Sequence, residues 1–279
     1  MTRVTLWGTR GSLAAPGADT ARYGGNTACV EVRGPAGSVL VLDAGTGIRP
    51  LGNALQGRVA RIHLLLSHLH MDHIQGLGFF NPLHDPDVEV HIWGPGSTTL
   101  DLKTRLNRYL SPPLFPVHLR DLPRLTVHEV PPGSFAIEEF RITARLVCHP
   151  GPTVGYRLEC ADGVVAYLSD HEPALGARTF PQAADWTSGF EIARDADLLI
   201  HDAQYTDEEY ARRVGWGHSR IADALRFATL ARVRKLVTFH HDPEHSDADI
   251  ERLTESALAR QQPPFPVVAG AEGTTFELG

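Results

Sequence analysis

The stretch "LLLSHLHMDHIQGLG", residues 64–78, places His68, His70, Asp72 and His73 within six positions directly behind an apolar run. Imidazole and carboxylate groups without thiolate suit Zn²⁺, Mn²⁺ or iron. Side chains two residues apart in an extended segment point the same way, so His68 and His70 are expected to bind one ion together. Asp72 and His73 lie where the chain turns into a helix, and they suit a second ion.

Metal-capable side chains also end other apolar segments of the chain. The apolar run of each predicted strand forces it inside, and the residue that follows emerges at the rim of the sheet. Polar groups that merely satisfied one another in a core would fall at mixed positions within the strands. The pattern therefore predicts several ligands that converge at one edge. The six strand-ending residues are Asp43, His68, His149, Asp170, Asp202 and His240.

Composition narrows the class of protein. The chain of 279 residues is 42% hydrophobic and 21% charged, which is typical of a soluble globular protein. It contains no apolar stretch of membrane-spanning length and no signal-like start, so a cytoplasmic protein without a membrane partner is expected. Cys29, Cys148 and Cys160 lack CxxC spacing, which favours reduced thiols over a thiolate zinc site. The net charge of −7 disfavours a long nucleic acid as partner.

Strands and a smaller number of helices are expected along the chain. Many strands before few helices predict a layered α/β fold, in one domain over residues 1–279. Helical periodicity covers 220–233 and 247–261, and the Pro-rich stretch 109–123 is expected to be a surface loop or lid. The strands are predicted at 3–8, 28–33, 38–43, 61–67, 88–93, 140–149, 154–160, 164–170, 197–202, 235–240 and 274–278.

The motif "HLHMDH" resembles the signature of the metallo-β-lactamase superfamily. The segments "VLDAGTG", "CHPGPTVGYRL", "LSDHE", "HDAQY", "GHS" and "FHHDP" extend this resemblance over nearly the whole chain. It implies a four-layer αβ/βα sandwich with a site for two divalent metal ions at one edge, most simply zinc, with manganese or iron as alternatives. A homodimer is compatible with this interpretation.

The same resemblance implies a role for each ligand. His68, His70 and His149 would hold the first ion. The second ion would be held by Asp72, His73 and His240, and Asp170 would bridge the two. Asp43 and Asp202 would orient the ligands from behind, as the outer partners of metal sites do.

The later motifs resemble the phosphodiesterase branch of the superfamily, which includes ribonuclease Z and the phosphoribosyl cyclic phosphodiesterases. His218 precedes His240 by 22 positions, and Ser219 is expected to start the helix between them. His218 is interpreted either as a neighbour of the helix cap without chemistry or as a donor to the phosphate or leaving group. In the second case, a hydroxide that bridges the ions attacks phosphorus, and Asp72 accepts a hydrogen bond from it.

Two departures from that branch limit the substrate. Ribonuclease Z carries a long arm for tRNA between its distal histidine and its bridging aspartate, but only 20 residues separate His149 from Asp170 here. The three cysteines do not reproduce the extra zinc site of the phosphoribosyl enzymes. We therefore expect a hydrolase of small cyclic or short nucleotide-type phosphodiesters. A carbon-ester, lactone or thioester hydrolase and a non-catalytic ligand-binding protein are the alternatives.

Segments 94–123 and 171–195 are expected to set substrate choice. The first of them could supply a base-stacking aromatic side chain and a phosphate-pairing arginine, or it could simply form a surface helix with a Pro-rich exit. Its candidate residues are Arg105, Arg108, Tyr109, Phe115, His118 and Arg120. His171 is expected to lie at the rim of the site, and His241 is expected to be a structural residue.

Overall fold

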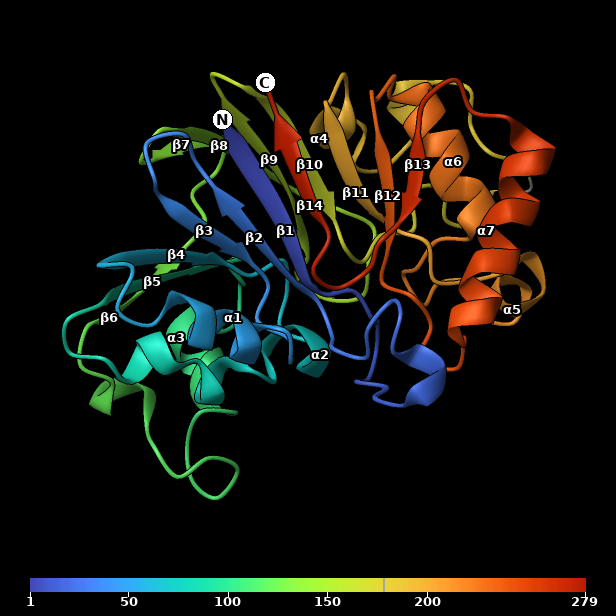
Figure 1. The fold of residues 1–279 in the computed structure, drawn as a ribbon. Helices are drawn as coiled ribbons and strands as arrows, with labels where there is room; N and C mark the ends of the chain where they lie inside the picture. Colours follow the sequence, from blue (N-terminus) through green and yellow to red (C-terminus); the bar gives the residue numbers. More distant parts are fainter. Residues whose placement is uncertain (178) are drawn as a thin grey trace.

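The computed structural model describes residues 1–177 and 179–279. Within them, two seven-stranded sheets pack face to face (Figure 1). The first sheet has the order β14-β1-β2-β3-β4-β5-β6, and the second has the order β13-β12-β11-β10-β9-β8-β7. The strands of the first sheet are β1 Thr2–Gly8, β2 Cys29–Arg33, β3 Val39–Leu42, β4 Arg61–Leu65, β5 Glu89–Gly94, β6 Leu125–Glu129 and β14 Thr275–Leu278. Those of the second are β7 Ser134–Ile137, β8 Phe140–Leu146, β9 Val154–Cys160, β10 Gly163–Leu168, β11 Leu198–Asp202, β12 Leu236–Phe239 and β13 Val267–Ala269.

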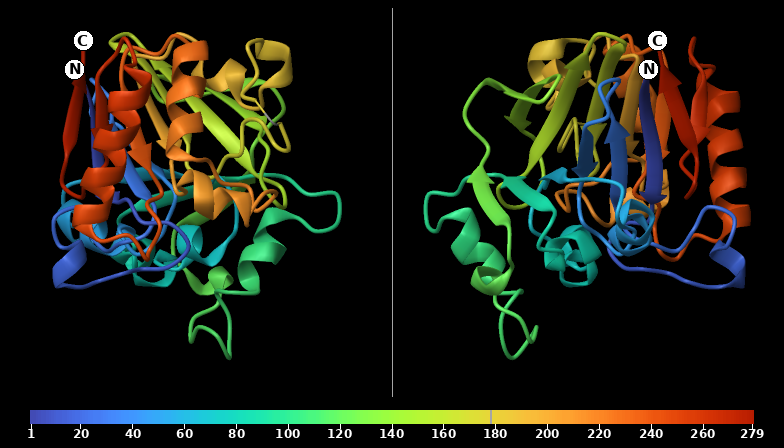
Figure 2. Two further views of the ribbon diagram at one scale, coloured as in Figure 1. Left: turned by 90° about the vertical axis from the view of Figure 1, so that its right-hand side faces the viewer. Right: turned by 60° about the vertical axis from the view of Figure 1, so that its left-hand side comes forward.

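Helices cover the outer face of each sheet (Figures 1 and 2). The α-helices are α1 Ile48–Leu55, α2 Met71–Ile74, α3 Leu102–Asn107, α4 Phe190–Ala193, α5 Asp207–Ala211, α6 Ile221–Leu230 and α7 Asp247–Gln261. Single turns of 3-10 helix lie at Ala18–Thr20, Leu77–Phe79, Asn81–His84, Leu119–Asp121 and Ala184–Trp186.

Three apolar cores separate the four layers. The central core lies between the sheets and contains Val4, Leu40, Tyr156 and other inward residues of both sheets. A second core lies between the first sheet and the helices on its α1 side. A third core lies between the second sheet and helices α4, α6 and α7. Strands such as β3 and β11 are buried on both faces, which explains their continuous apolar sequences. The predicted four-layer αβ/βα sandwich is confirmed.

Parallel pairing brings the predicted ligands to one edge. β3 pairs with β4, and β10, β11 and β12 pair successively, all in parallel, so their C-terminal ends meet. Most of the predicted ligands lie one to three residues beyond the strands instead of closing them; β4 ends at Leu65 and β8 at Leu146. Asp43 and His240 have φ values of 60° and 59°. Such left-handed conformations turn the chain sharply out of the ladder and are costly for residues other than glycine.

The structure confirms the bounds of one predicted helix and corrects the start of the other. α7 has the predicted bounds, and its N-terminus is a capping box in which Ser246 and Asp249 exchange hydrogen bonds. α6 begins at Ile221 with Arg220 as its N-cap, so the prediction that Ser219 starts this helix is wrong. The hydroxyl of Ser219 donates to the carbonyl of His171, and its backbone N–H donates to Asp202. Ser219 is therefore engaged in the site and not in the helix.

The segment between β5 and β6 is more ordered than a simple loop. It contains α3, and its distal part projects from the body of the molecule (Figure 2). A guanidinium nitrogen of Arg105 donates to the carbonyl of Pro95, and the Tyr109 hydroxyl donates to the carbonyl of Gln75. Phe115 packs edge-on against Phe79. These contacts hold Arg105, Tyr109 and Phe115, whereas Arg108 and Arg120 are exposed, so the role of this segment in substrate choice stays a prediction.

None of the helices in the described part of the chain combines the length and the apolar character that a membrane crossing needs.

Candidate metal centre

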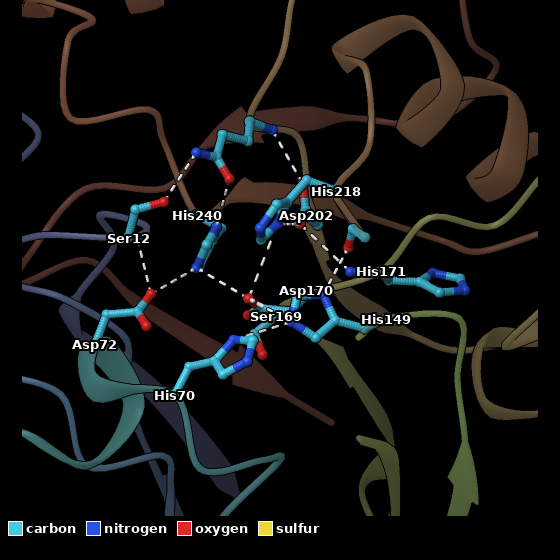
Figure 3. A network of polar contacts seen from close by, with 12 residues as sticks. Ser12, His70, Asp72, His149, Ser169, Asp170, His171, Asp202, His218 and His240 are labelled. Atoms are coloured by element: carbon cyan, nitrogen blue, oxygen red, sulfur yellow. Dashed lines mark hydrogen bonds and ion pairs between the residues drawn. The ribbon is translucent and has the colours of Figure 1, made fainter. Parts of the chain in front are cut away.

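Seven side chains from distant segments converge at the sheet edge. Figure 3 shows five of them, namely His70, Asp72, His149, Asp170 and His240. One group consists of His68, His70 and His149, whose potential ligand atoms lie within 4.8 Å of one another. The ring centroids of His68 and His70 are 4.4 Å apart, and those of His68 and His149 are 4.8 Å apart. The prediction that His68 and His70 point the same way thus agrees with the geometry, although both lie just beyond the strand.

A second group lies beside the first and consists of Asp72, His73, Asp170 and His240. His240 Nε2 is 3.1 Å from Asp72 Oδ2 and 3.3 Å from His73 Nε2. Asp170 Oδ1 is 2.9 Å from His73 Nε2.

Asp170 also faces the first group. Its Oδ2 lies 3.7 Å from His68 Nε2 and 3.8 Å from His149 Nε2. Asp170 therefore stands between the two groups, which is the position that a carboxylate shared by two ions would need.

Hydrogen bonds from behind fix four of the imidazoles. His73 Nδ1 is 2.8 Å from Asp43 Oδ2, and His149 Nδ1 is 2.9 Å from the carbonyl oxygen of Gly217. His68 Nδ1 contacts the Ser67 hydroxyl at 3.0 Å, and His240 Nδ1 lies 3.2 Å from Gln204 Oε1. In each case Nε2 is left to face the centre, an arrangement that sets the tautomer of metal-binding histidines. The outer partners are Asp43, Gly217, Ser67 and Gln204.

Asp43 orients a predicted ligand from behind, as expected, whereas Asp202 contacts His218, which was not predicted as a ligand. Asp43 is fully buried and accepts hydrogen bonds from the Tyr167 hydroxyl and from both the backbone and the side chain of Ser67. Asp202 is also fully buried; it accepts from the backbone of Ser219 and lies 2.7 Å from His218 Nδ1. Asp43 thus supports His73, whereas Asp202 supports His218.

Burial keeps the three-histidine group neutral. Desolvation lowers the pKa of His149 to about 4, and it holds the pKa of His68 well below its ordinary value. The pKa of His70 is lowered for the same reason. Neutral imidazoles have a free lone pair, so these three side chains are ready to act as ligands.

Charge pairing dominates the second group. Burial would lower the pKa of His240, but the carboxylates of Asp170 and Asp72 outweigh it and raise this pKa to about 9. Asp170 similarly raises the pKa of the buried His73. Burial would raise the pKa of Asp170, but the neighbouring His240, His73 and His68 hold it well below its usual range. In this group, protons on His73 and His240 balance the negative charge of the neighbouring carboxylates. A bound divalent cation could balance the same charge in place of these protons.

The inward-facing atoms fit a metal ion. His68 Nε2 is buried and makes no hydrogen bond within the described part of the chain, and the buried Asp170 Oδ1 has there only its ion-pair contact with His73. Such buried polar atoms are costly unless something binds them. Nitrogen and carboxylate donors without thiolate suit zinc, manganese or iron. The donor set and its unpaired atoms therefore agree with the divalent metal that the fold implies.

Three contributors were not singled out from the sequence. Gln204, two residues after Asp202, donates from its amide to Ser12 Oγ and places its oxygen toward His240. The backbone N–H of Ser12 donates to Asp72 Oδ2 at 2.7 Å (Figure 3). A side chain on Gly11 would overlap the His240 ring, which explains a glycine there. The motif "HDAQY" contained Gln204, but only the fold shows what its side chain reaches.

His171 and His241 lie away from the seven residues. His171 was expected at the rim, but it is fully buried, and its Nδ1 lies 2.9 Å from His201 Nε2. The His171 ring packs edge-on against Phe227 of α6, so it is covered and does not face the centre of the site. His241 faces the Gly270 carbonyl oxygen at 2.9 Å, as expected for a structural residue.

We expect Gln204→Ala to weaken metal binding by about 10- to 100-fold, the usual cost of losing an outer partner. The alanine removes the acceptor that fixes the His240 ring. Competition with a chromogenic chelator measures the affinity of each ion separately, and Gln56→Ala at the exposed end of α1 is a matched control. Gln204→Glu retains an acceptor oxygen and should restore most of the affinity. Unchanged affinity in Gln204→Ala would show that His240 needs no such support.

Comparisons with known proteins agree with this fold and cluster. Residues 39–241 match the family described as "Beta-lactamase superfamily domain". The match spans most of the chain and contains all seven clustered residues, and the protein belongs to this superfamily. Ribonuclease Z of Haloferax volcanii is 29% identical over 238 residues, which cover 70% of this chain and 72% of that protein. Ribonuclease Z of Myxococcus xanthus is 28% identical over 256 residues, with coverages of 77% and 80%.

A solved structure shows the same fold. The short form of human tRNase Z superposes with a TM-score of 0.69 at 22% identity, and the alignment covers 99% of each chain. The predicted metallo-β-lactamase fold is therefore confirmed, and with it a fold that implies divalent metal. The relatives named ribonuclease Z support the prediction that this chain is a metal-dependent hydrolase.

Proposed function

We propose that the protein hydrolyses phosphodiesters with two divalent metal ions, zinc in the first place and manganese or iron as alternatives. The observation that carries this proposal is the pair formed by His218 and Asp202 beside the clustered ligands. The His218 ring stacks on the His240 ring with centroids 4.9 Å apart, and it meets His149 edge-on at 5.1 Å. An imidazole that is held by a hydrogen bond in this place lies next to both metal positions. It can donate a proton to the leaving group of a phosphodiester.

The seven clustered residues divide into two binding sets. When bound, such ions lower the pKa of water and stabilise the charge that develops on phosphate oxygens. His68, His70 and His149 would hold one ion, and Asp72, His73 and His240 would hold the other, with Asp170 between them.

Asp202 fixes the orientation of His218. Because Asp202 Oδ2 lies 2.7 Å from His218 Nδ1, the imidazole carries its Nδ1 proton toward the carboxylate and presents Nε2 on its other side. A protonated Nε2 can donate to the leaving oxygen of the diester as the P–O bond breaks. Asp202 would also stabilise the charged imidazole before the proton leaves.

Asp72 has a second role in this proposal. The Ser12 N–H and His240 Nε2 both approach its Oδ2. Its other oxygen, Oδ1, is free to accept a hydrogen bond from the water that attacks phosphorus and so to orient it. Ser12, whose φ is 60°, contributes by aiming its backbone N–H at Asp72.

The chain's short connections favour a small substrate. Residues between His149 and Asp170 form the β9–β10 hairpin, in which β9 ends at Cys160 and β10 begins at Gly163. This hairpin leaves no arm that could clasp a folded RNA, and the net charge of −7 opposes binding to a long polyanion. We therefore propose cyclic or short linear nucleotide-type diesters, even though the relatives above are named for ribonuclease Z.

A substrate panel tests this function. We expect turnover of bis-p-nitrophenyl phosphate, a dinucleotide and the 2′,3′- or 3′,5′-cyclic nucleotides, all abolished by chelator and restored by metal. p-Nitrophenyl acetate and a lactone should be poor substrates, because the proposed proton donor serves a phosphate ester. Preferential cleavage of the acetate or lactone would favour the carbon-ester alternative. Faster cleavage of a pre-tRNA than of every small diester would reject the proposed substrate size.

A further inference from the structure

A groove of about 970 Å³ opens on the flank of the site between α5, α6 and α7. One wall carries Tyr205 and Trp216 with Arg212 and Arg213, and α7 lines the other wall with residues that include Arg260. The two longer helices lie side by side on the outside of the second sheet (Figures 1 and 2). The groove has the size of a pocket for a nucleotide-like ligand.

The wall nearest the site is built as a stack. The Arg213 guanidinium carbon lies 5.0 Å from the centroid of the Tyr205 ring and 5.9 Å from that of the Trp216 ring. Trp216 is 60% exposed despite its large apolar surface. Stacking restrains Arg213, and an exposed indole beside a restrained guanidinium is suited to a base and its phosphate.

Glu172 anchors this wall to the candidate metal centre. It is buried, and its carboxylate accepts hydrogen bonds from the Tyr210 hydroxyl and from the backbone N–H groups of Gly215 and Gly217. Gly217 in turn supplies the carbonyl oxygen that faces His149 Nδ1. The segment that carries Trp216 is thus tied at several points to the catalytic edge.

The groove also joins the site directly through Tyr205. Its ring meets the His218 ring edge-on, with centroids 5.7 Å apart. Tyr205 is buried, so its ring separates His218 from the groove by the thickness of one aromatic side chain, and a strand whose scissile phosphate lies near His218 would reach Trp216 over the surface above it.

The charges in the groove favour an anion in spite of the acidic chain. Five arginines and four carboxylates line the groove. Of the carboxylates, Asp207 is paired with Arg220, Glu209 with His245 and Asp249 with Arg252, whereas the exposed Glu208 has no ion-pair partner in the described ranges. Arg212, Arg213 and Arg260 have no ion-pair partner in the described ranges 1–177 and 179–279. Their charges remain available to phosphates.

We propose that this groove holds the single-stranded nucleotides next to the scissile bond, so that the preferred substrate is a short linear oligonucleotide and not a cyclic nucleotide. The inference rests on the proposed phosphodiesterase function. A cyclic mononucleotide has no residue beyond its own phosphate to contact Trp216, whereas a linear strand can stack a base there and place a phosphate on Arg213.

Binding of a labelled single-stranded RNA hexanucleotide to the zinc-loaded protein tests the groove. Fluorescence anisotropy is measured in a His218→Ala background, in which turnover is expected to be slow enough for binding to be read first. Trp216→Ala should weaken binding by about 5- to 150-fold, the usual cost of losing one stacked base. Trp216→Phe should recover most of the affinity. Arg213→Ala should weaken binding and reduce the slope of log affinity against log salt by about 0.7.

Arg234→Ala is the matched control, because Arg234 precedes β12 at the end of the sheet opposite the site. It should leave hexanucleotide binding unchanged. If Trp216→Ala and Arg213→Ala bind the hexanucleotide as tightly as their parent, the groove is not the strand-binding surface.

Hydrolysis of methyl p-nitrophenyl phosphate separates this inference from the proposed function. This diester carries no nucleotide, so Trp216→Ala in the otherwise natural chain should hydrolyse it within about twofold of the parent rate while losing activity on the hexanucleotide. An equal loss on both substrates would overturn the groove assignment. Failure of the unaltered protein to hydrolyse any diester with zinc, manganese or iron would instead overturn the proposed function, and the binding result would then stand alone.

Discussion

Replacing His68 by alanine is expected to cost most of the bound metal and nearly all activity together. His68 supplies a buried, neutral imidazole whose Nε2 lies 3.7 Å from Asp170 Oδ2. Losing an outer partner of a metal site typically costs about 10- to 100-fold in metal affinity. Losing a ligand should cost more, because its lone pair is removed outright and Asp170 loses a neighbour.

Metal analysis by mass spectrometry measures this effect without reference to catalysis. The natural protein should carry close to two ions per chain, and His68→Ala should carry fewer at the same free metal concentration. Bound metal also stabilises the folded state, by about 4 kcal/mol when its concentration is a thousand times Kd. The melting temperature of the natural protein should therefore fall on chelation more than that of His68→Ala.

His84→Ala is the control for this experiment, since His84 is exposed, its Nε2 contacts the Gly78 carbonyl oxygen, and it is not one of the seven clustered residues. It should retain both metal and activity. A His68→Ala protein with a full complement of ions and unchanged affinity would remove His68 from the ligand set.

The ligand positions could be predicted because two local rules coincide. An apolar run such as residues 64–66 must be buried, and the polar residues after it emerge at the sheet edge. Parallel pairing of β3 with β4 and of β10 with β11 and β12 then gathers these ends. The two-residue spacing of His68 and His70 also predicts that their side chains point the same way. These inferences need only the periodicity of the sequence and the topology of the sheets. The resemblance to a known family supplied the topology.

The residues that support the ligands could not be predicted in the same way. Gln204 contacts His240, which lies 36 residues further along the chain, and Ser12 contacts Asp72 across 60 residues. Neither contact follows from a local pattern. Ser12 and Asp43 also adopt left-handed backbone conformations that propensities disfavour. His171 was misplaced at the rim for a related reason, because only the packing of α6 against β11 shows that it is covered.

The groove beside α5 also depends on tertiary structure. Arg213 and Trp216 are separated by two residues in a segment without periodicity, and only the fold stacks them on Tyr205. The sequence drew attention instead to residues 94–123, where arginines and aromatic residues are dense. There, Arg105 and Tyr109 contact backbone carbonyls of their own layer. Residue types alone therefore did not show which side chains of this segment are held by other contacts and which, such as Arg108 and Arg120, stay exposed.

His218→Ala is expected to retain both metal ions and to lose about 10²- to 10⁴-fold in turnover of a dinucleotide, the usual contribution of a general acid or base. The metals should stay because His218 contacts Asp202 and stacks on His240 without belonging to either of the two ligand sets. Mass spectrometry of the loaded variant checks the metals, and single-turnover assays check the chemical step.

The leaving group provides the decisive comparison for His218. A nucleoside alkoxide needs a proton as it departs, whereas p-nitrophenolate is stable without one. If His218 donates that proton, His218→Ala should lose far more activity on the dinucleotide than on bis-p-nitrophenyl phosphate. Asp202→Asn should show the same selectivity, because the amide cannot stabilise the charged imidazole. Equal losses on both substrates would mean that His218 acts on the phosphate itself, and near-normal turnover of the dinucleotide would exclude it from catalysis.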